Sequence, residues 1–291
     1  MSLSCVSIFT DTRYAQSSWF KETYAGICAS ASRNKLTVRT YESEPLPEEL
    51  ETLPRAVIVA GGAHNCLSNN VTFLTQYHKQ VVLAGIDSEL FSEPVSCATL
   101  NRRAETERLV AYLHQCKKTR IALFGFQPRS INDMIRYHAA LSAAEAGGQP
   151  ISRDGVFFCR SSIRECFAKF LPWATCCDAV ICPNDIVAVY FIGSAKKNGI
   201  AVPEDLFVTG FSNMSIGQHC NPSLTTIAMD MFAVGTSAFD AWHFLQKNSD
   251  STVQIKIEVP AKLLVRSSTA HIAEQTHPSG VHMVDHGEDA F

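Results

Sequence analysis

Strand-like apolar segments alternate with helix-like segments along most of this chain, and this alternation limits the fold more than any other feature. β-Branched strands that alternate with helices predict a parallel sheet covered by helices on both faces. In the first hundred residues, one helix is expected to begin at Ser17 or Ser18, and a second is expected to span Val71–His78. The expected strands there are Cys5–Phe9, Leu36–Tyr41, Ala56–Ala60 and Val81–Ala84.

A second series of the same kind begins near Asn101, a candidate N-cap. Its expected helices are Arg102–Cys116, Ile131–Ala146, Ile163–Leu171, a helix opened by Pro183-Asn184-Asp185, and Asp230–Gln246. Its expected strands are Arg120–Phe124, Gly155–Cys159, Ala179–Cys182, Leu206–Gly210, Leu224–Ile227, Val253–Val259 and Lys262–Val265. Because 291 residues exceed the roughly 100–200 of a typical domain, two α/β lobes are expected.

Composition and charge narrow the function classes. The net charge of −3 and the absence of a long Lys/Arg run argue against nucleic-acid binding by this chain alone. Eleven dispersed cysteines are typical of reduced cytoplasmic thiols. The segment that starts at Met1 runs directly into a strand, without a basic and apolar leader, so we expect no signal peptide, no membrane span and a cytoplasmic protein.

Polar residues follow the expected strands at five places. In open α/β sheets, ligands bind in the crevice outside the carboxyl ends of strands. Two lobes facing each other would direct all five clusters into one cleft, although helix capping or turn formation is the alternative for each residue alone, and the better one for Asp185 and Asn213. The clusters contain Asp11, Arg13 and Tyr14; Asp87; Asn132 and Arg136; Asn184 and Asp185; and Ser212 and Asn213.

Motifs for catalysis, cofactors or metals are weak. Gly61-Gly62 is not a GxGxxG fingerprint and follows the third strand, so a tight turn explains it better than a dinucleotide site. No GxSxG nucleophile elbow occurs. The four histidines of the tail lack the spacing of a helical zinc site: His271, His277, His282 and His286. We therefore expect no enzyme activity, no cofactor and no metal.

Several segments of the second half resemble the LacI/GalR family of transcription regulators. They are Asn184-Asp-Ile-Val-Ala188, Gly199-Ile-Ala-Val-Pro-Glu-Asp-Leu-Phe-Val-Thr-Gly-Phe211, Pro222-Ser-Leu-Thr-Thr-Ile227 and Pro260-Ala-Lys-Leu-Leu-Val-Arg-Ser-Ser-Thr269. The resemblance implies a type I periplasmic-binding-protein-like fold, with two doubly wound parallel-sheet lobes joined by three crossovers. Residues 1–99 with about 229–257 would form the N-terminal lobe. Residues 100–228 with about 258–270 would form the C-terminal lobe, and 271–291 a loose tail.

The resemblance also implies roles for single residues. Arg136 matches the family arginine that clamps the effector, and Asn184 matches a family asparagine that binds a ligand hydroxyl. Asp87 matches an acidic position of the first lobe, and Asp11 and Arg13 lie on the first ligand loop. Ser212 departs from the family pattern, because an aspartate is common at this position. Hydrogen bonds to a charged acceptor are stronger than those to a neutral one, so the serine would bind sugar hydroxyls less strongly.

A further departure is that nothing before Cys5 matches the helix-turn-helix head of the family. The leading interpretation is therefore a homodimeric effector-binding domain that closes around a sugar-like metabolite and reaches operator DNA only through a head outside this chain. Two alternatives remain open. One is the solute-binding protein of an uptake system, and the other is a small α/β enzyme.

Overall fold

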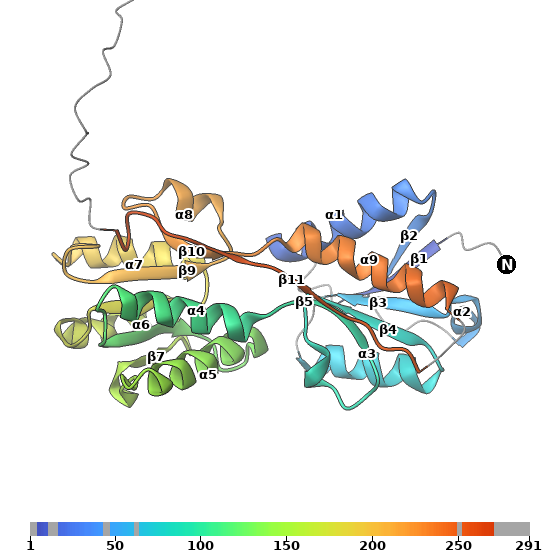
Figure 1. Cartoon of the computed structure of the whole chain (residues 1–291), viewed down its shortest axis with the longest axis horizontal. Coiled ribbons are helices and arrows are strands. Elements are labelled where there is room, and N and C mark those ends of the chain that lie inside the picture. The colour runs from blue at the N-terminus through green and yellow to red at the C-terminus, as the bar shows by residue number, and fades with distance from the viewer. Residues whose placement is uncertain (1–4, 11–16, 43–46, 61–63, 249–251, 271–291) are drawn as a thin grey trace, which may run out of the picture.

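The computed structural model describes residues 5–10, 17–42, 47–60, 64–248 and 252–270, and it contains two six-stranded sheets. The chain passes between the two sheets three times (Figure 1). It leaves the first sheet after β5 (Ser96–Leu100), returns after β10 (Thr225–Ala228), and leaves again after β11 (Lys256–Val259). The expected fold class, two doubly wound α/β lobes joined by three crossovers, is confirmed.

All neighbouring strands of the first sheet are parallel, in the order β11-β5-β4-β3-β1-β2. Its remaining strands are β1 (Cys5–Phe9), β2 (Thr37–Tyr41), β3 (Ala56–Ala60) and β4 (Gln80–Ala84). Helices lie on both faces because successive strand residues point to opposite sides. Ile58 packs on one side with α1 (Ser18–Arg33) and α9 (Met231–Lys247), whereas Val57 and Val59 face α2 (Pro47–Thr52) and α3 (His64–Gln76).

Two glycines allow α1 and α9 to approach each other closely. A Cβ atom on Gly235 would lie 2.0 Å from the carbonyl oxygen of Thr23, and one on Gly26 would lie 2.2 Å from that of Phe232. Real Cβ atoms do not come that close to backbone oxygens, so only glycine fits at either position. Trp242, fully buried beside this contact, donates from Nε1 to the carbonyl of Ala56 at 2.7 Å and fixes α9 on the sheet.

The second sheet has the order β12-β10-β9-β8-β6-β7, and only β12 runs antiparallel to its neighbour. Its strands besides β10 are β6 (Ile121–Phe126), β7 (Val156–Phe158), β8 (Ala179–Ile181), β9 (Phe207–Phe211) and β12 (Lys262–Leu264). One face packs against α4 (Arg102–Gln115) and α5 (Ile131–Ala146), and the other against α6 (Ile163–Phe170) and α7 (Asp185–Lys197). Short elements complete the chain: η1 (Ser88–Leu90), η2 (Arg153–Gly155), η3 (Leu171–Cys176) and α8 (Ser215–His219).

The expected elements occur in the structure in the expected order, but α2, α8 and the three short η helices were not expected, and three further points differ. Helix α3 begins at His64, not Val71, and its earlier part extends the apolar face by Leu67, which is buried with Val71 and Leu74. Strand β5 was not expected, since Ser96-Cys-Ala-Thr-Leu is fully buried but contains few β-branched residues. The last strand of the first sheet starts at Lys256, three residues after the expected Val253.

The division into lobe ranges stays a prediction, and the tail 271–291 and Gly61-Gly62 lie outside the described residues.

Ten cysteines with described side chains are free thiols. No helix in the described ranges is long and apolar enough to cross a membrane.

Candidate functional site

A cavity of about 210 Å³ lies where the two sheets face each other. Its walls come from α1, from the loop after β4, and from the starts of α4, α5, α7 and α9. A larger cavity of about 930 Å³ shares five of its wall residues and continues the cleft: Trp19, Asn184, Ser212, Met229 and Met231. The crevice is therefore built from the carboxyl ends of strands in both lobes, as the sequence predicts.

Arg136 lies one turn into α5, and its side chain is placed by aromatic and sulfur contacts. The guanidinium carbon sits 4.6 Å from the centre of the Phe211 ring, and Nη2 donates to Met229 Sδ at 3.5 Å. Nη1 is 3.8 Å from Asp133 Oδ1, while buried Nε has no partner among the described residues. Burial lowers the pKa of Arg136, and the nearby Asp133 and Asp185 carboxylates act in the opposite direction. The residue is only 6% exposed and lines the cavity, so its guanidinium lies inside the cleft before any ligand binds.

Arg102, the first residue of α4, is a second buried guanidinium in the same wall. It is 8% exposed, and Nη2 donates to the carbonyl of Gly85 at 2.8 Å. Its Nε is buried without a partner in the described chain. Burial, and secondarily the charge of Arg136, lowers the pKa of Arg102 to about 9. The two arginines are thus close enough to repel each other.

Asn184 and Asp185 fix the entry of α7 into the cleft. Asn184 is the N-cap, and its Oδ1 accepts from Val187 N at 3.0 Å. That bond leaves the amide nitrogen of Asn184 free to donate towards the cavity it lines. Asp185 is fully buried and accepts from the Thr226 hydroxyl at 2.7 Å and from Met214 N at 2.6 Å. Burial raises the pKa of Asp185 to about 6 despite these bonds.

Ser212 and Asn132 add neutral polar groups to the wall. Ser212 follows β9 with a φ of 111°, a conformation that side-chain-bearing residues rarely adopt. Its backbone N–H donates to the Ile227 carbonyl at 2.8 Å, which holds this strained position. Asn132, in the first turn of α5, has a buried Oδ1 without a partner in the described chain. Both side chains suit ligand groups that donate or accept single hydrogen bonds.

Four predicted site residues therefore line one cavity: Asn132, Arg136, Asn184 and Ser212. Asp87 lies elsewhere, because it caps η1 by accepting from Glu89 N at 3.1 Å and pairs with Lys256 at 3.2 Å. Asp11, Arg13 and Tyr14 lie outside the described residues. That these residues bind a ligand stays a prediction.

Sequence reasoning missed several wall residues, Arg102 above all. An arginine beside an N-cap is usually a solvated residue, and only the fold shows that this one turns inward. Trp19, Met229 and Met231 also line the cavity, and as apolar residues they carry no polar signal in the sequence. His, Cys, Asp and Glu side chains do not gather in threes to hold a metal ion anywhere in the described part of the chain.

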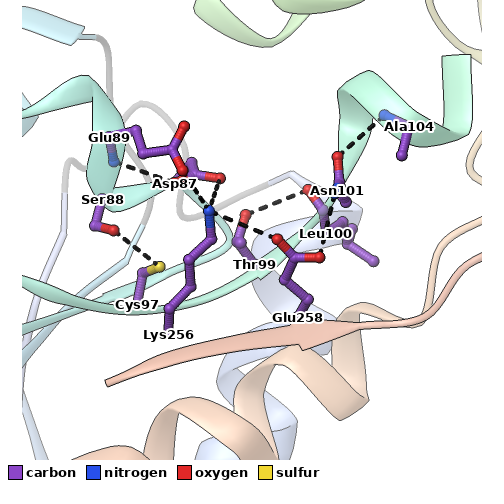
Figure 2. Close-up of polar contacts among 10 residues, drawn as sticks. All are labelled: Asp87, Ser88, Glu89, Cys97, Thr99, Leu100, Asn101, Ala104, Lys256 and Glu258. Carbon is purple, nitrogen blue, oxygen red and sulfur yellow. Dashed lines mark hydrogen bonds and ion pairs between the residues drawn. The ribbon is translucent and has the colours of Figure 1, made fainter. Parts of the chain in front are cut away.

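A polar network joins two of the three passages between the sheets (Figure 2). Lys256 of β11 pairs with Asp87 at 3.2 Å, with Glu89 at 2.8 Å and with Glu258 at 3.6 Å. Glu258 Oε2 also accepts from Asn101 Nδ2 at 3.2 Å, just before α4. Hydrogen bonds from Lys256 to these carboxylates raise its pKa, so it stays charged at neutral pH.

Sequence comparison adds a relationship that the geometry alone does not give. The profile of the periplasmic binding protein-like domain matches residues 110–269, more than half of the chain. The chain belongs to this family. The HTH-type transcriptional repressor PurR of Pasteurella multocida is 32% identical over 136 residues, which cover 46% of this chain and 40% of PurR. The chain thus spans less than half of that repressor, and its predicted resemblance to LacI/GalR regulators is confirmed.

Solved structures of transcriptional regulators share the fold of this chain across both sheets. A structure described as the transcriptional regulator LacI from Bacillus cereus subsp. cytotoxis has a TM-score of 0.77 at 17% identity, covering 92% of this chain and 99% of that chain. The complex of the transcriptional regulator CelR with cellobiose has a TM-score of 0.72 at 17% identity, covering 91% and 84%. At these identities the likeness establishes the fold.

Proposed function

We propose that this chain is the effector-binding and dimerisation domain of a LacI-type transcriptional regulator, and that the cleft between its lobes binds a small, sugar-like metabolite. The observation that carries the proposal is a pair of buried guanidiniums, with unpartnered Nε atoms, in the wall of an interlobe cavity. Buried polar groups without partners are costly, so they are retained where a ligand supplies the missing bonds. The CelR structure offers a precedent, since that relative of the fold is bound to cellobiose.

The mechanism follows from the position of the cavity. A ligand that contacts Trp19 on one lobe and Arg136 on the other favours the lobe orientation in which both contacts form. Such closure would rotate the lobes about the three passages, in the manner of hinge motion. The ligand shifts the equilibrium between the two orientations only by the difference between its affinities for them, not by its total affinity.

The partners of the whole regulator belong to the same proposal. Operator DNA would be bound by a head outside this chain, in the cytoplasm, and a homodimer would bring two heads to one operator. Ligand-driven closure would then alter the spacing of the heads. The proposal includes no catalytic step.

A thermal-shift screen tests the proposal. A ligand that binds the folded cleft alone raises the melting temperature by mass action. Neutral sugars, sugar acids and nucleobases should be screened at 1–10 mM, roughly the range that reveals weak binding. At least one class should raise the melting temperature of the wild-type chain and fail to do so for Arg136→Ala. A stabilising compound that acts equally on both proteins would place its site outside the cleft.

A further inference from the structure

Two arginines converge on one cavity whose described wall contains a single carboxylate. Arg102 comes from the start of α4 and Arg136 from the first turns of α5, and both are more than nine-tenths buried. Each keeps a buried Nε without a partner among the described residues. The described wall of the 210 Å³ cavity contains three arginines, the third being the exposed Arg129, against one carboxylate, Asp133.

That carboxylate is already engaged. Asp133 Oδ2 accepts from Gln127 N at 3.0 Å, and Oδ1 is 3.8 Å from Arg136, a distance beyond a hydrogen bond. No carboxylate within salt-bridge distance of Arg102 is found in the described chain, and its one described hydrogen bond goes to a neutral carbonyl, that of Gly85. Counted over the residues that line the cavity, the two buried guanidiniums face one carboxylate, while Asp87 and Asp185 act on Arg102 and Arg136 from outside the wall. Unpaired buried charge is expensive, so a ligand of the opposite sign would gain most here.

The other polar groups of the wall are neutral. Asn132 presents an unpartnered buried Oδ1, Asn184 an amide nitrogen, and Ser212 a hydroxyl. These groups donate or accept single bonds and suit hydroxyls better than charges. The cavity thus has a cationic part and a neutral, hydrogen-bonding part.

Building on the proposed function, we infer that the effector is a hydroxylated carboxylate whose carboxylate is bound between Arg102 and Arg136. One negative charge balances the excess of guanidiniums over carboxylates in the wall, whereas the nearly two charges of a phosphate at neutral pH would reverse it. A guanidinium fork matches the two oxygens of a carboxylate, and each bond is charge-assisted. Ser212 then has a role, because a neutral hydroxyl there does not repel the anion.

Matched ligands and matched variants test the inference. The probes are D-glucose with D-glucuronate, D-galactose with D-galacturonate, and acetate at up to 50 mM as the simplest carboxylate. Binding is measured by calorimetry and thermal shift at constant ionic strength, with chloride as the reference anion. The variants are Arg102→Gln and its neighbour Arg103→Gln, an exposed residue of the same helix outside the cavity wall. Both variants lose one charge, but only the first loses it from the cleft.

The expected result is that carboxylates stabilise the wild-type chain and Arg103→Gln more than the neutral partners do. Arg102→Gln should weaken carboxylate binding by about 10- to 100-fold, the range for a lost charge-assisted bond. Ser212→Asp should weaken carboxylates and spare neutral sugars. The melting temperature of free Arg102→Gln should not fall below that of Arg103→Gln, because an unpaired buried charge is removed.

Three results would overturn the inference. They are carboxylate binding unchanged in Arg102→Gln, a preference for sugar phosphates such as D-glucose 6-phosphate, and no stabilisation by any carboxylate, acetate included. If neutral sugars bind and Arg136→Ala abolishes that binding, the proposed function stands while the carboxylate is ruled out. If no compound of any class binds the cleft, both fail together.

Discussion

Glu258 Oε2 accepts a 3.2 Å hydrogen bond from Asn101 Nδ2, and this bond ties the third passage between the sheets to the first. Asn101 also caps α4, since its Oδ1 accepts from Ala104 N at 3.0 Å. One amide therefore serves both the contact between the two passages and the helix that begins with Arg102 (Figure 2). The placement of that arginine in the cleft depends on a residue outside the cleft.

Replacement of Asn101 tests this double role. Asn101→Ala should lower the free energy of unfolding by about 0.5–2 kcal/mol, the usual cost of a lost N-cap. Glu258→Ala is the matched control, because it removes the same interpassage bond and leaves the cap intact. Its cost should stay below about 1 kcal/mol, as for an exposed polar pair. Urea denaturation measures both, and equal losses would contradict a separate capping role.

The buried Asp185 carboxylate predicts a pH-dependent stability. Burial raises its pKa to about 6, so the folded state holds the proton more tightly than the unfolded state does. The stabilisation that the folded state gains from this tighter proton binding is fully present below the ordinary aspartate pKa and is lost as pH rises through about 6. Asp185→Asn does not titrate. The stability of the wild type relative to this variant should fall by roughly 2–3 kcal/mol between pH 4 and pH 7.5. Urea curves for the two proteins that run parallel over this range would refute the assignment.

The close contact of α1 and α9 predicts that replacing two glycines by alanine has very different effects on stability. Gly235→Ala places a Cβ 2.0 Å from the Thr23 carbonyl oxygen, so the helices must separate. We expect a loss of more than about 2 kcal/mol, as for overpacked cores. Gly193→Ala on α7 is the control, since its Cβ meets no atom within 4 Å. It should leave stability unchanged or raise it by up to about 1 kcal/mol. Thermal unfolding distinguishes them, and similar melting temperatures would contradict the packing.

The charge of the chain predicts no binding to duplex DNA. With a net charge of −3, the chain lacks the surplus of cations that neutralises phosphates and releases counterions. A gel-shift assay at about 100 mM salt should show no complex at micromolar protein. A salt-dependent shift would mean that these residues contact DNA themselves.

Much of the fold could be predicted from local patterns. Strands such as Ala56–Ala60 are continuous apolar runs, and Asn101 and Asn184 cap helices where their positions suggest. Strand β5 could not be predicted from its own sequence, because burial between β4 and β11 decides it. The early start of α3 was missed although Leu67, Val71 and Leu74 share one buried helical face. The local sequence pattern predicts a helix or strand correctly where the segment's own residues determine its structure.

The site shows the same limit more clearly. Asn132 and Arg136 were found because polar residues follow β6 at a topologically expected place. Asp87 also follows a strand, yet it pairs with Lys256, which lies far from it in the sequence, and does not line the cavity. Arg102 obeys the rule too, since it lies two residues after the end of β5, but it was missed because that strand was not expected. Segments that are distant in sequence decided both cases, because Lys256 pairs with Asp87 and the neighbouring strands bury β5.

Calorimetry on Arg136→Ala tests the central claim, ligand binding in the interlobe cleft, most directly. The ligand is the compound that most strongly raises the melting temperature of the wild-type chain. Arg136→Ala should keep the wild-type circular dichroism spectrum and lose binding by at least about 100-fold, because a buried charged fork is removed from the site. An unchanged dissociation constant in the folded variant would contradict the account.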